Sequence, residues 1–306
     1  MTSTNGNSRR KRSLPYILQL AHWGAPLRDE KARHLEAFSA KSSDGVSLAG
    51  VIAGNPNGAP ILFIHGFSQC HLAWRRQLTD PELMARFRMV AYDMRGHGGS
   101  DKPMEIEHYS DDRLWADDLA AVIAATGVKR PVVVAWSYGG RVVSDYLSFY
   151  SQDGLSGVNY VAAVTKSDRA FWGPEHRHIR AMASDDLMTN IRASRKLVYA
   201  TVAQRPAGDD LEMALAYTML VPAKVRAGLL HRTNNDGRVL GSLQLGVLVT
   251  HGALDRIVLP AAGRYTATRV RGARLSLYGG VGHSPFLEDP LRFNRELSEF
   301  VAARQH

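Results

Sequence analysis

A serine at the junction of a strand and a helix is the residue of this sequence best placed for nucleophilic chemistry. Ser137 lies in VVVAWSYGG, residues 132–140, directly after a β-branched run, with Ala135 two positions before it and Gly139 two after. On so sharp a turn the serine oxygen projects above the edge of the sheet, and larger side chains at 135 or 139 would collide with the neighbouring strand and helix. The N–H groups that open the following helix point at the same place and favour negative charge there.

This segment resembles the nucleophile turn of the α/β-hydrolase superfamily, in its capped branch of esterases and haloperoxidases, although Ala135 stands where glycine is usual. Three further segments match the family in the right order, at residues 64–67, 250–258 and 279–286. The resemblance covers about residues 38–166 and 245–304. It implies an α/β fold: a mostly parallel eight-stranded sheet, flanked by helices and carrying a helical cap insertion.

By this resemblance, a carboxylate and a histidine complete a triad with Ser137. Asp255 follows a predicted strand and a glycine turn, where it would hold the histidine tautomer and stabilise the imidazolium. Asp168 is the alternative acid, because some family members keep theirs after the preceding strand. His283 lies in a glycine-rich loop and completes the order Ser, Asp, His of this fold.

The resemblance also implies an oxyanion hole and a pocket beside the serine. The backbone N–H groups of Phe67, which follows His65-Gly66, and of Tyr138 would hold the oxyanion. Three aromatic residues are candidates for the substrate pocket: Trp136, Phe171 and Trp172. Phe171 and Trp172 could equally form a small core of the insertion.

Other polar residues of these segments have structural interpretations. His65 is expected to form hydrogen bonds within its turn, and the 92–101 segment is expected to be a structural loop in which Asp93 pairs with Arg95. His97 in that loop is an alternative catalytic residue. His176-Arg177-His178 could be half of a metal site, but no Cys or Glu stands at ligand spacing, so no metal site is predicted.

Short β-type runs alternate with longer helical ones, which predicts βαβ units. Phe38–Lys41 and Val46–Ala53 should form an antiparallel hairpin around the turn at 43–45. Further strands are predicted at 60–64, 89–92, 132–136, 160–165, 245–250 and 274–278. Helices are predicted at 110–126, from 140 towards 150, at 260–268 and at 287–304.

The spacing of these elements predicts the domain organisation. Residues 169–236 show helical periodicity without strand signals, so they are predicted to form the cap. Residues 35–168 and 237–306 are predicted to form the core, and residues 1–34 a basic tail with a lead-in segment. The length of 306 residues also fits two domains.

Composition restricts the classes of partner. The net charge of +9 includes Arg9, Arg10, Lys11 and Arg12 of the tail, and no basic stripe with aromatic residues follows, so nucleic-acid binding is not expected. Cys70 is the single cysteine, which excludes an internal disulfide and suggests a cytoplasmic protein. The oligomeric state stays open, with a homodimer among the alternatives.

No apolar run approaches the roughly 18 residues of a membrane span, so stable membrane insertion is not expected. The apolar stretch at 14–23 could be a twin-arginine signal or an interfacial helix. A solvated tail whose Tyr16, Leu18 and Trp23 dock on the body of the protein is the favoured interpretation.

Together these features predict a serine hydrolase that cleaves a carboxylic ester or related small acyl substrate through an acyl-enzyme, without a cofactor. A C–C bond hydrolase, lactonase, perhydrolase or acyltransferase could use the same triad. A ligand-binding receptor with slow turnover is the alternative from another class.

Overall fold

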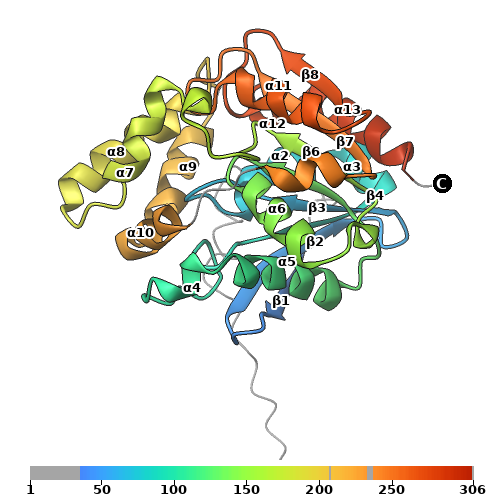
Figure 1. Ribbon diagram of the computed structural model, residues 1–306, viewed down its shortest axis with the longest axis horizontal. Helices are drawn as coiled ribbons and strands as arrows, with labels where there is room; N and C mark the ends of the chain where they lie inside the picture. The colour runs from blue at the N-terminus through green and yellow to red at the C-terminus, as the bar shows by residue number, and fades with distance from the viewer. Residues whose placement is uncertain (1–34, 207, 233–236, 305–306) are drawn as a thin grey trace, which may run out of the picture.

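The chain folds around one eight-stranded sheet, seen in a computed structural model that describes residues 35–206, 208–232 and 237–304 (Figure 1). The strand order is β1-β2-β4-β3-β5-β6-β7-β8. The pairs β1 with β2 and β2 with β4 are antiparallel, and all the remaining pairs are parallel. The strands are β1 Glu36–Lys41, β2 Ser47–Gly54, β3 Ala59–Ile64, β4 Phe87–Tyr92, β5 Val132–Trp136, β6 Gly157–Val161, β7 Gly246–Gly252 and β8 Arg274–Tyr278.

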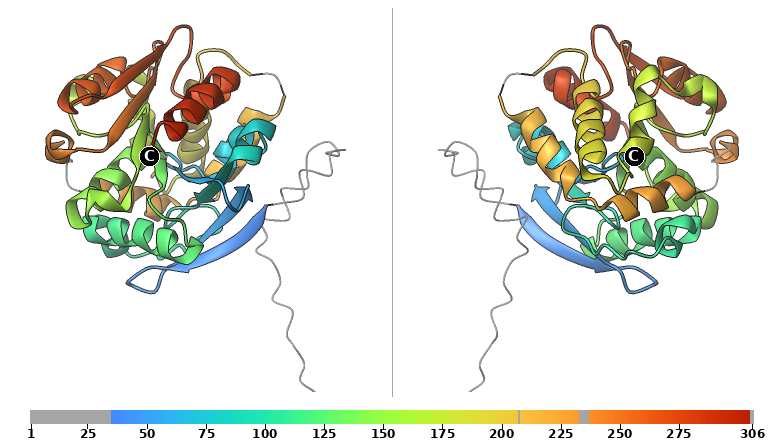
Figure 2. Two further views of the ribbon diagram at one scale, coloured as in Figure 1. Left: turned by 90° about the vertical axis from the view of Figure 1, so that its right-hand side faces the viewer. Right: turned by 90° about the vertical axis from the view of Figure 1, so that its left-hand side faces the viewer.

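Helices cover both faces of the sheet, which explains why the central strands β3 and β5 are apolar throughout. Leu62, Val133 and Val249 face the core shared with α5 Asp112–Thr126, α6 Gly139–Phe149 and α11 Pro260–Arg269. Phe63 and Val134 point to the other face, which packs against the helices α2 Arg75–Leu78, α3 Pro81–Arg86 and α13 Pro290–Ala302. Figure 2 shows these two helical layers on either side of the twisted sheet. The mostly parallel α/β fold is therefore confirmed.

Between β6 and β7 the chain forms a helical insertion, which lies to one side of the sheet in Figure 1. It opens with two short 3-10 turns, Arg169–Phe171 and Pro174–Arg177. Its helices are α7 His178–Ala181, α8 Leu187–Ala200, α9 Asp210–Met219 and α10 Ala223–His231. Within the described residues, no single helix is long and apolar enough to cross a membrane; α9 and α10 reach that length only together and are bent by 84°.

Smaller elements complete the fold. They are the α-helices α4 Glu107–Ser110 and α12 Pro285–Glu288, and the 3-10 turns His71–Trp74, Gln152–Gly154 and Arg238–Ser242. The predicted tail at 1–34, with the apolar stretch at 14–23, lies outside the described residues.

Two predicted elements were misplaced. The strand expected at 160–165 is β6, at Gly157–Val161, because Ala162 turns to a φ of 44° and the chain leaves the sheet there. The helix expected at 287–304 is divided into α12 and α13, since Asp289 adopts a non-helical conformation before Pro290.

Candidate active site

The serine turn is built as its sequence predicts. Ser137 has a φ of 53°, a left-handed conformation that is costly for a residue with a Cβ and that here reverses the chain between β5 and α6. The turn is held by the Ser137 N–H, which donates to the Val161 carbonyl at 2.9 Å, and by the Ser137 carbonyl, which accepts from Val164 N at 2.9 Å. A Cβ on Gly139 would lie 2.9 Å from the Ile64 carbonyl oxygen, which explains the small residue there.

His283 and Asp255 meet beside this turn. The Nδ1 atom of His283 lies 2.7 Å from Asp255 Oδ2, and both side chains are buried. Because a carboxylate only accepts, Nδ1 carries the proton in this pair. The other oxygen, Asp255 Oδ1, accepts from the backbone N–H groups of Ile257 at 2.9 Å and Val258 at 3.1 Å. Asp255 therefore has a fixed orientation towards the histidine.

A second histidine contacts the same carboxylate. His251 Nε2 lies 3.2 Å from Asp255 Oδ2 and 2.9 Å from the Val258 carbonyl oxygen. Burial alone would raise the pKa of Asp255, but His283 and His251 outweigh that effect and lower the pKa to about 2. Asp255 is thus an anion at neutral pH.

The tryptophan before the serine connects Ser137 to the histidine loop. Trp136 Nε1 donates to the His283 carbonyl oxygen at 2.8 Å, and the two rings lie 5.6 Å apart. The Ser137 hydroxyl itself hydrogen-bonds no other described residue, so the contact between Ser137 Oγ and His283 Nε2 is not formed in this structure. Catalytic hydrogen bonds of this kind often tighten only when substrate binds.

The two predicted oxyanion donors come from different loops near the serine. Phe67 is in the loop after β3, Tyr138 is the N-cap of α6, and their rings lie 6.3 Å apart. A Cβ on Gly66 would lie 3.2 Å from Ser137 Cβ, so the loop passes directly beside the nucleophile. Within the described chain, neither the Phe67 nor the Tyr138 backbone N–H donates to an acceptor.

Two histidines behind this loop are structural. His65 Nδ1 donates to the Gly66 carbonyl at 2.8 Å, and its Nε2 accepts from Met94 N at 3.0 Å. His97 repeats the pattern, donating to the Arg95 carbonyl at 2.8 Å and accepting from Ser68 N at 3.2 Å. Burial lowers the pKa of His65 to about 4 and that of His97 well below its usual value, so both rings stay neutral.

The expected pairing of Asp93 with Arg95 is wrong. Arg95 pairs with Asp118 at 2.6 Å and with Asp44 at 2.9 Å, because it points back towards α5 and the β1–β2 turn. Asp93 instead accepts from His71 Nδ1 at 2.9 Å.

The alternative acid does not contact the histidine. Asp168 Oδ2 pairs with Lys166 at 3.0 Å, and its other oxygen accepts from Ala170 N to cap a 3-10 turn. Of the two candidate carboxylates, the structure brings only Asp255 to His283.

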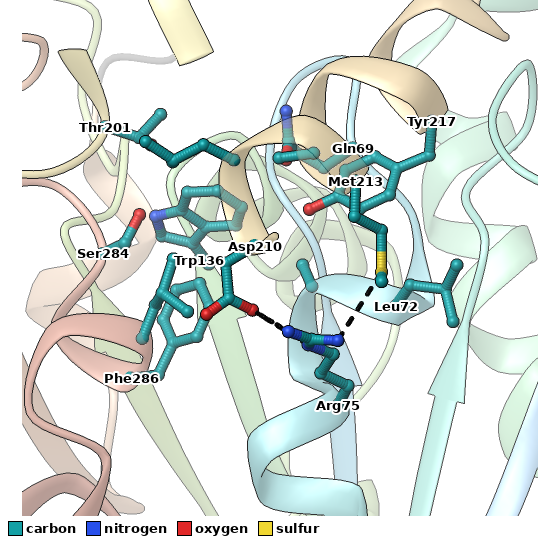
Figure 3. Close-up of a pocket in the computed structure, with 14 residues that line it drawn as sticks. Gln69, Leu72, Arg75, Trp136, Thr201, Asp210, Met213, Tyr217, Ser284 and Phe286 are labelled. Carbon is teal, nitrogen blue, oxygen red and sulfur yellow. Dashed lines mark hydrogen bonds and ion pairs between the residues drawn. The ribbon is translucent and has the colours of Figure 1, made fainter. Parts of the chain in front are cut away.

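A pocket lies between the cap and the core, next to this group (Figure 3). Trp136 and Ser284, the immediate neighbours of Ser137 and His283, line it from the core. The cap contributes Thr201 and residues of α9, whose Asp210 is ion-paired with Arg75. Sequence reasoning missed these cap residues, because nothing in a helical pattern indicates which face meets the core.

Phe171 and Trp172, predicted to line the substrate pocket, do not line this one. Phe171 packs on Tyr265 with ring centroids 5.3 Å apart, and Trp172 forms a β-bridge with Val258 and stacks on His176 at 4.1 Å. Phe171 therefore packs the start of the insertion against α11, and Trp172 packs it against the loop that carries Asp255.

One group in the described part of the chain has the composition of a metal site: Cys70, His71 and Asp93. The group is a poor fit for an ion, because Asp93 already accepts from His71 Nδ1 and from the backbone N–H groups of His71 and Gly99. His178 pairs with Glu175 at 3.0 Å, and His176 stacks on Trp172, so these two histidines do not converge.

Comparison with known proteins agrees with this architecture. Residues 61–296 match the model of the alpha/beta hydrolase family. A putative aryl esterase from Burkholderia cenocepacia is 36% identical, with a TM-score of 0.83 over 88% of this chain and 99% of its own. An esterase from Rhodococcus sp. ECU1013 is 32% identical, with a TM-score of 0.82 over 89% and 99%. A bifunctional esterase/perhydrolase from Acinetobacter calcoaceticus is 28% identical over 80% of this chain and 93% of its own length. The chain therefore belongs to the alpha/beta hydrolase family.

Proposed function

We propose that this hydrolase cleaves carboxylic esters of modest size, with Ser137 as nucleophile, His283 as general base and Asp255 as the acid of the triad. The observation that carries the proposal is the 2.7 Å contact between His283 Nδ1 and Asp255 Oδ2 beside a serine held at positive φ. Two similar solved structures support it, a putative aryl esterase and an esterase.

The proposed reaction proceeds through an acyl-enzyme on Ser137. His283 Nε2 takes the hydroxyl proton as Ser137 Oγ attacks the carbonyl carbon, and the carbonyl electrons move to oxygen. The resulting oxyanion rests on the N–H groups of Phe67 and Tyr138, each worth a few kcal/mol. His283 then protonates the departing alcohol and activates water, which releases the acid from Ser137.

The pocket between the cap and the core has a mixed lining, with Gln69, Arg75 and Asp210 beside apolar side chains, and Ser137 and His283 are not among the residues that line it. Leu72, Met213 and Leu287 line it together with the aromatic rings of Trp136 and Tyr217. The similarity to a putative aryl esterase makes aryl and short-chain esters the first substrates to test.

The test is the variant Ser137→Ala, assayed with p-nitrophenyl acetate and with a fluorophosphonate probe. We expect kcat to fall by several orders of magnitude and labelling to disappear. Ser148→Ala, on the same helix α6, is the matched control and should keep both. Retention of most esterase activity in the Ser137 variant would refute the assignment. Labelling of the wild type without turnover of any ester would favour a receptor.

A second reaction at the same serine is perhydrolysis, which the esterase/perhydrolase relative supports. Hydrogen peroxide would take the place of water and attack the acyl carbon. The acyl group would then leave Ser137 as a peracid, and Ser137 Oγ would regain its proton. Peracid formation from acetate esters and hydrogen peroxide, absent in Ser137→Ala, is the expected result.

A further inference from the structure

A buried arginine of the cap contacts the loop of the proposed oxyanion hole. Arg226, on α10, is 0% exposed, and its Nε donates to Ser68 Oγ at 3.1 Å. Ser68 directly follows Phe67 and has a φ of 57°, a conformation that a serine adopts only when its surroundings hold it. One cap side chain therefore touches the residue next to a proposed oxyanion donor.

Every other contact of this guanidinium is with a neutral oxygen atom. Arg226 donates to the Asn190 amide oxygen at 2.6 Å and the Thr218 carbonyl at 2.5 Å. It also donates to the Met182 carbonyl at 2.8 Å and Ser194 Oγ at 3.3 Å. No carboxylate among the described residues pairs with it, and burial lowers its pKa to about 10.

Removing a charge from water is unfavourable, and even buried ion pairs can often be replaced by apolar residues of similar volume without loss of stability. Stability alone is thus a poor explanation for Arg226. A hydrogen bond from this buried side chain to Ser68 has another use: it can hold the neighbouring Phe67 N–H in the place where it would meet the oxyanion.

The loop is held from the core and from the cap at once. On the core side, Ser68 N donates to His97 Nε2 at 3.2 Å. On the cap side, besides the Arg226 contact, Gln69 Nε2 donates to Thr218 Oγ1 at 3.1 Å. The position of the Phe67 N–H therefore depends on how the cap is seated.

We propose that Arg226 is a positioning residue for the oxyanion hole: by holding Ser68, it fixes the Phe67 N–H and couples the seating of the cap to stabilisation of the tetrahedral intermediate. This inference rests on the proposed function.

The test compares Arg226→Met, Arg226→Lys, Ser68→Gly and the double variant Arg226→Met/Ser68→Gly. Glycine removes the hydroxyl acceptor while tolerating the positive φ. Lys224→Met is the matched control, because it removes an exposed positive charge from the same helix. With p-nitrophenyl acetate, we expect Arg226→Met and Ser68→Gly to lower kcat about 10- to 100-fold with KM within about threefold, as for displaced oxyanion donors.

A second readout separates positioning from folding. Ser137 Oγ adds to the carbonyl carbon of an aryl trifluoromethyl ketone, and His283 takes the serine proton. The ketone oxygen then becomes an oxyanion in the proposed oxyanion hole. Its inhibition constant should rise in parallel with the loss of kcat/KM, because both report oxyanion stabilisation. A loss of kcat with unchanged affinity for this ketone would overturn the proposal.

The double variant tests whether Arg226 acts through Ser68. If it does, the double variant loses no more kcat than Arg226→Met alone, whereas multiplied losses would overturn the proposal.

Arg226→Met leaves the Asn190 and Thr218 acceptors unpaired, so if it does not fold, Arg226→Lys and Ser68→Gly carry the test. Absence of Ser137-dependent hydrolysis in the wild type refutes the proposed function instead. An active wild type whose Arg226 and Ser68 variants match Lys224→Met refutes only this inference.

Discussion

At the scale of single residues, the site depends on how Asp255 is held. Its Oδ1 atom accepts from two backbone N–H groups, and its Oδ2 atom is shared between His283 and His251. This arrangement keeps the carboxylate ionised and aimed at His283 Nδ1. The proposed general base therefore has a defined tautomer before substrate arrives.

Asp255→Asn should lower kcat about 10⁴-fold, because the amide cannot stabilise the imidazolium and favours the wrong histidine tautomer. Steady-state hydrolysis of p-nitrophenyl acetate measures this. Asp168→Asn is the matched control, since Asp168 pairs with Lys166 and not with the histidine. Equal losses in the two variants would remove Asp255 from its proposed role.

The candidate triad could be predicted from the sequence because each member lies in a short local pattern. Ser137, Asp255 and His283 each follow a predicted strand and stand beside small or glycine residues. Arg226 and His251 could not be predicted in this way. The contact of Arg226 with Ser68 joins residues that are distant in the sequence. His251 lies only four residues before Asp255, but no local pattern indicates that its ring turns towards that carboxylate.

At the scale of elements, the loops after β7 and β8 must approach each other for Asp255 to reach His283. The closest approach is at Gly252, the last residue of β7, where a Cβ would overlap the Gly282 carbonyl oxygen of the histidine loop. Glu288 adds a second constraint, because it accepts from Gly282 N at 2.8 Å and from Ala203 N of the cap at 2.7 Å.

Gly252→Ala should therefore push the two loops apart, lowering kcat by at least about 100-fold, as expected for a displacement near 1 Å. It should also lower the melting temperature. Gly279→Ala is the control, because a Cβ at that position of the same histidine loop meets nothing within 4 Å. Kinetics and thermal unfolding of both variants check the prediction, which fails if they behave alike.

The elements themselves were largely predictable, since strand and helix periodicities are local. β8 has the predicted bounds, and the β1–β2 hairpin pairs as expected. The end of β6 was not predictable. Residues 162–165 are as compatible with a strand as those before them. The chain leaves the sheet at Ala162, which still donates from its N–H to the Thr250 carbonyl of β7 but takes a positive φ.

At the scale of the whole molecule, buried histidines link stability to pH. His65 and His97 are neutral when folded, with lowered pKa values, whereas the unfolded chain protonates both below about pH 6.5. Their contribution to the free energy of unfolding is therefore fully present above that pH and is lost as the pH falls. His71 acts in the opposite direction: burial would lower its pKa, but Asp93 outweighs burial and raises it.

His97→Gln isolates one of these contributions, because the glutamine oxygen can still accept from Ser68 N without taking up a proton. Between about pH 7.5 and 5.5, the wild type should lose on the order of 1 kcal/mol more unfolding free energy than this variant. Urea unfolding at both pH values measures the difference. The same pH dependence in both proteins would show that His97 does not contribute.

The place of the cap in the chain has a further consequence. Because the insertion leaves after β6 and returns to β7, its direct neighbour in the sheet, its two ends are anchored close together. A different cap could be spliced between these strands without shifting their register. A grafted cap would still have to place a guanidinium, or an equivalent donor, at Ser68. The cap residues that select the substrate and the cap residue that maintains the rate could therefore be changed independently.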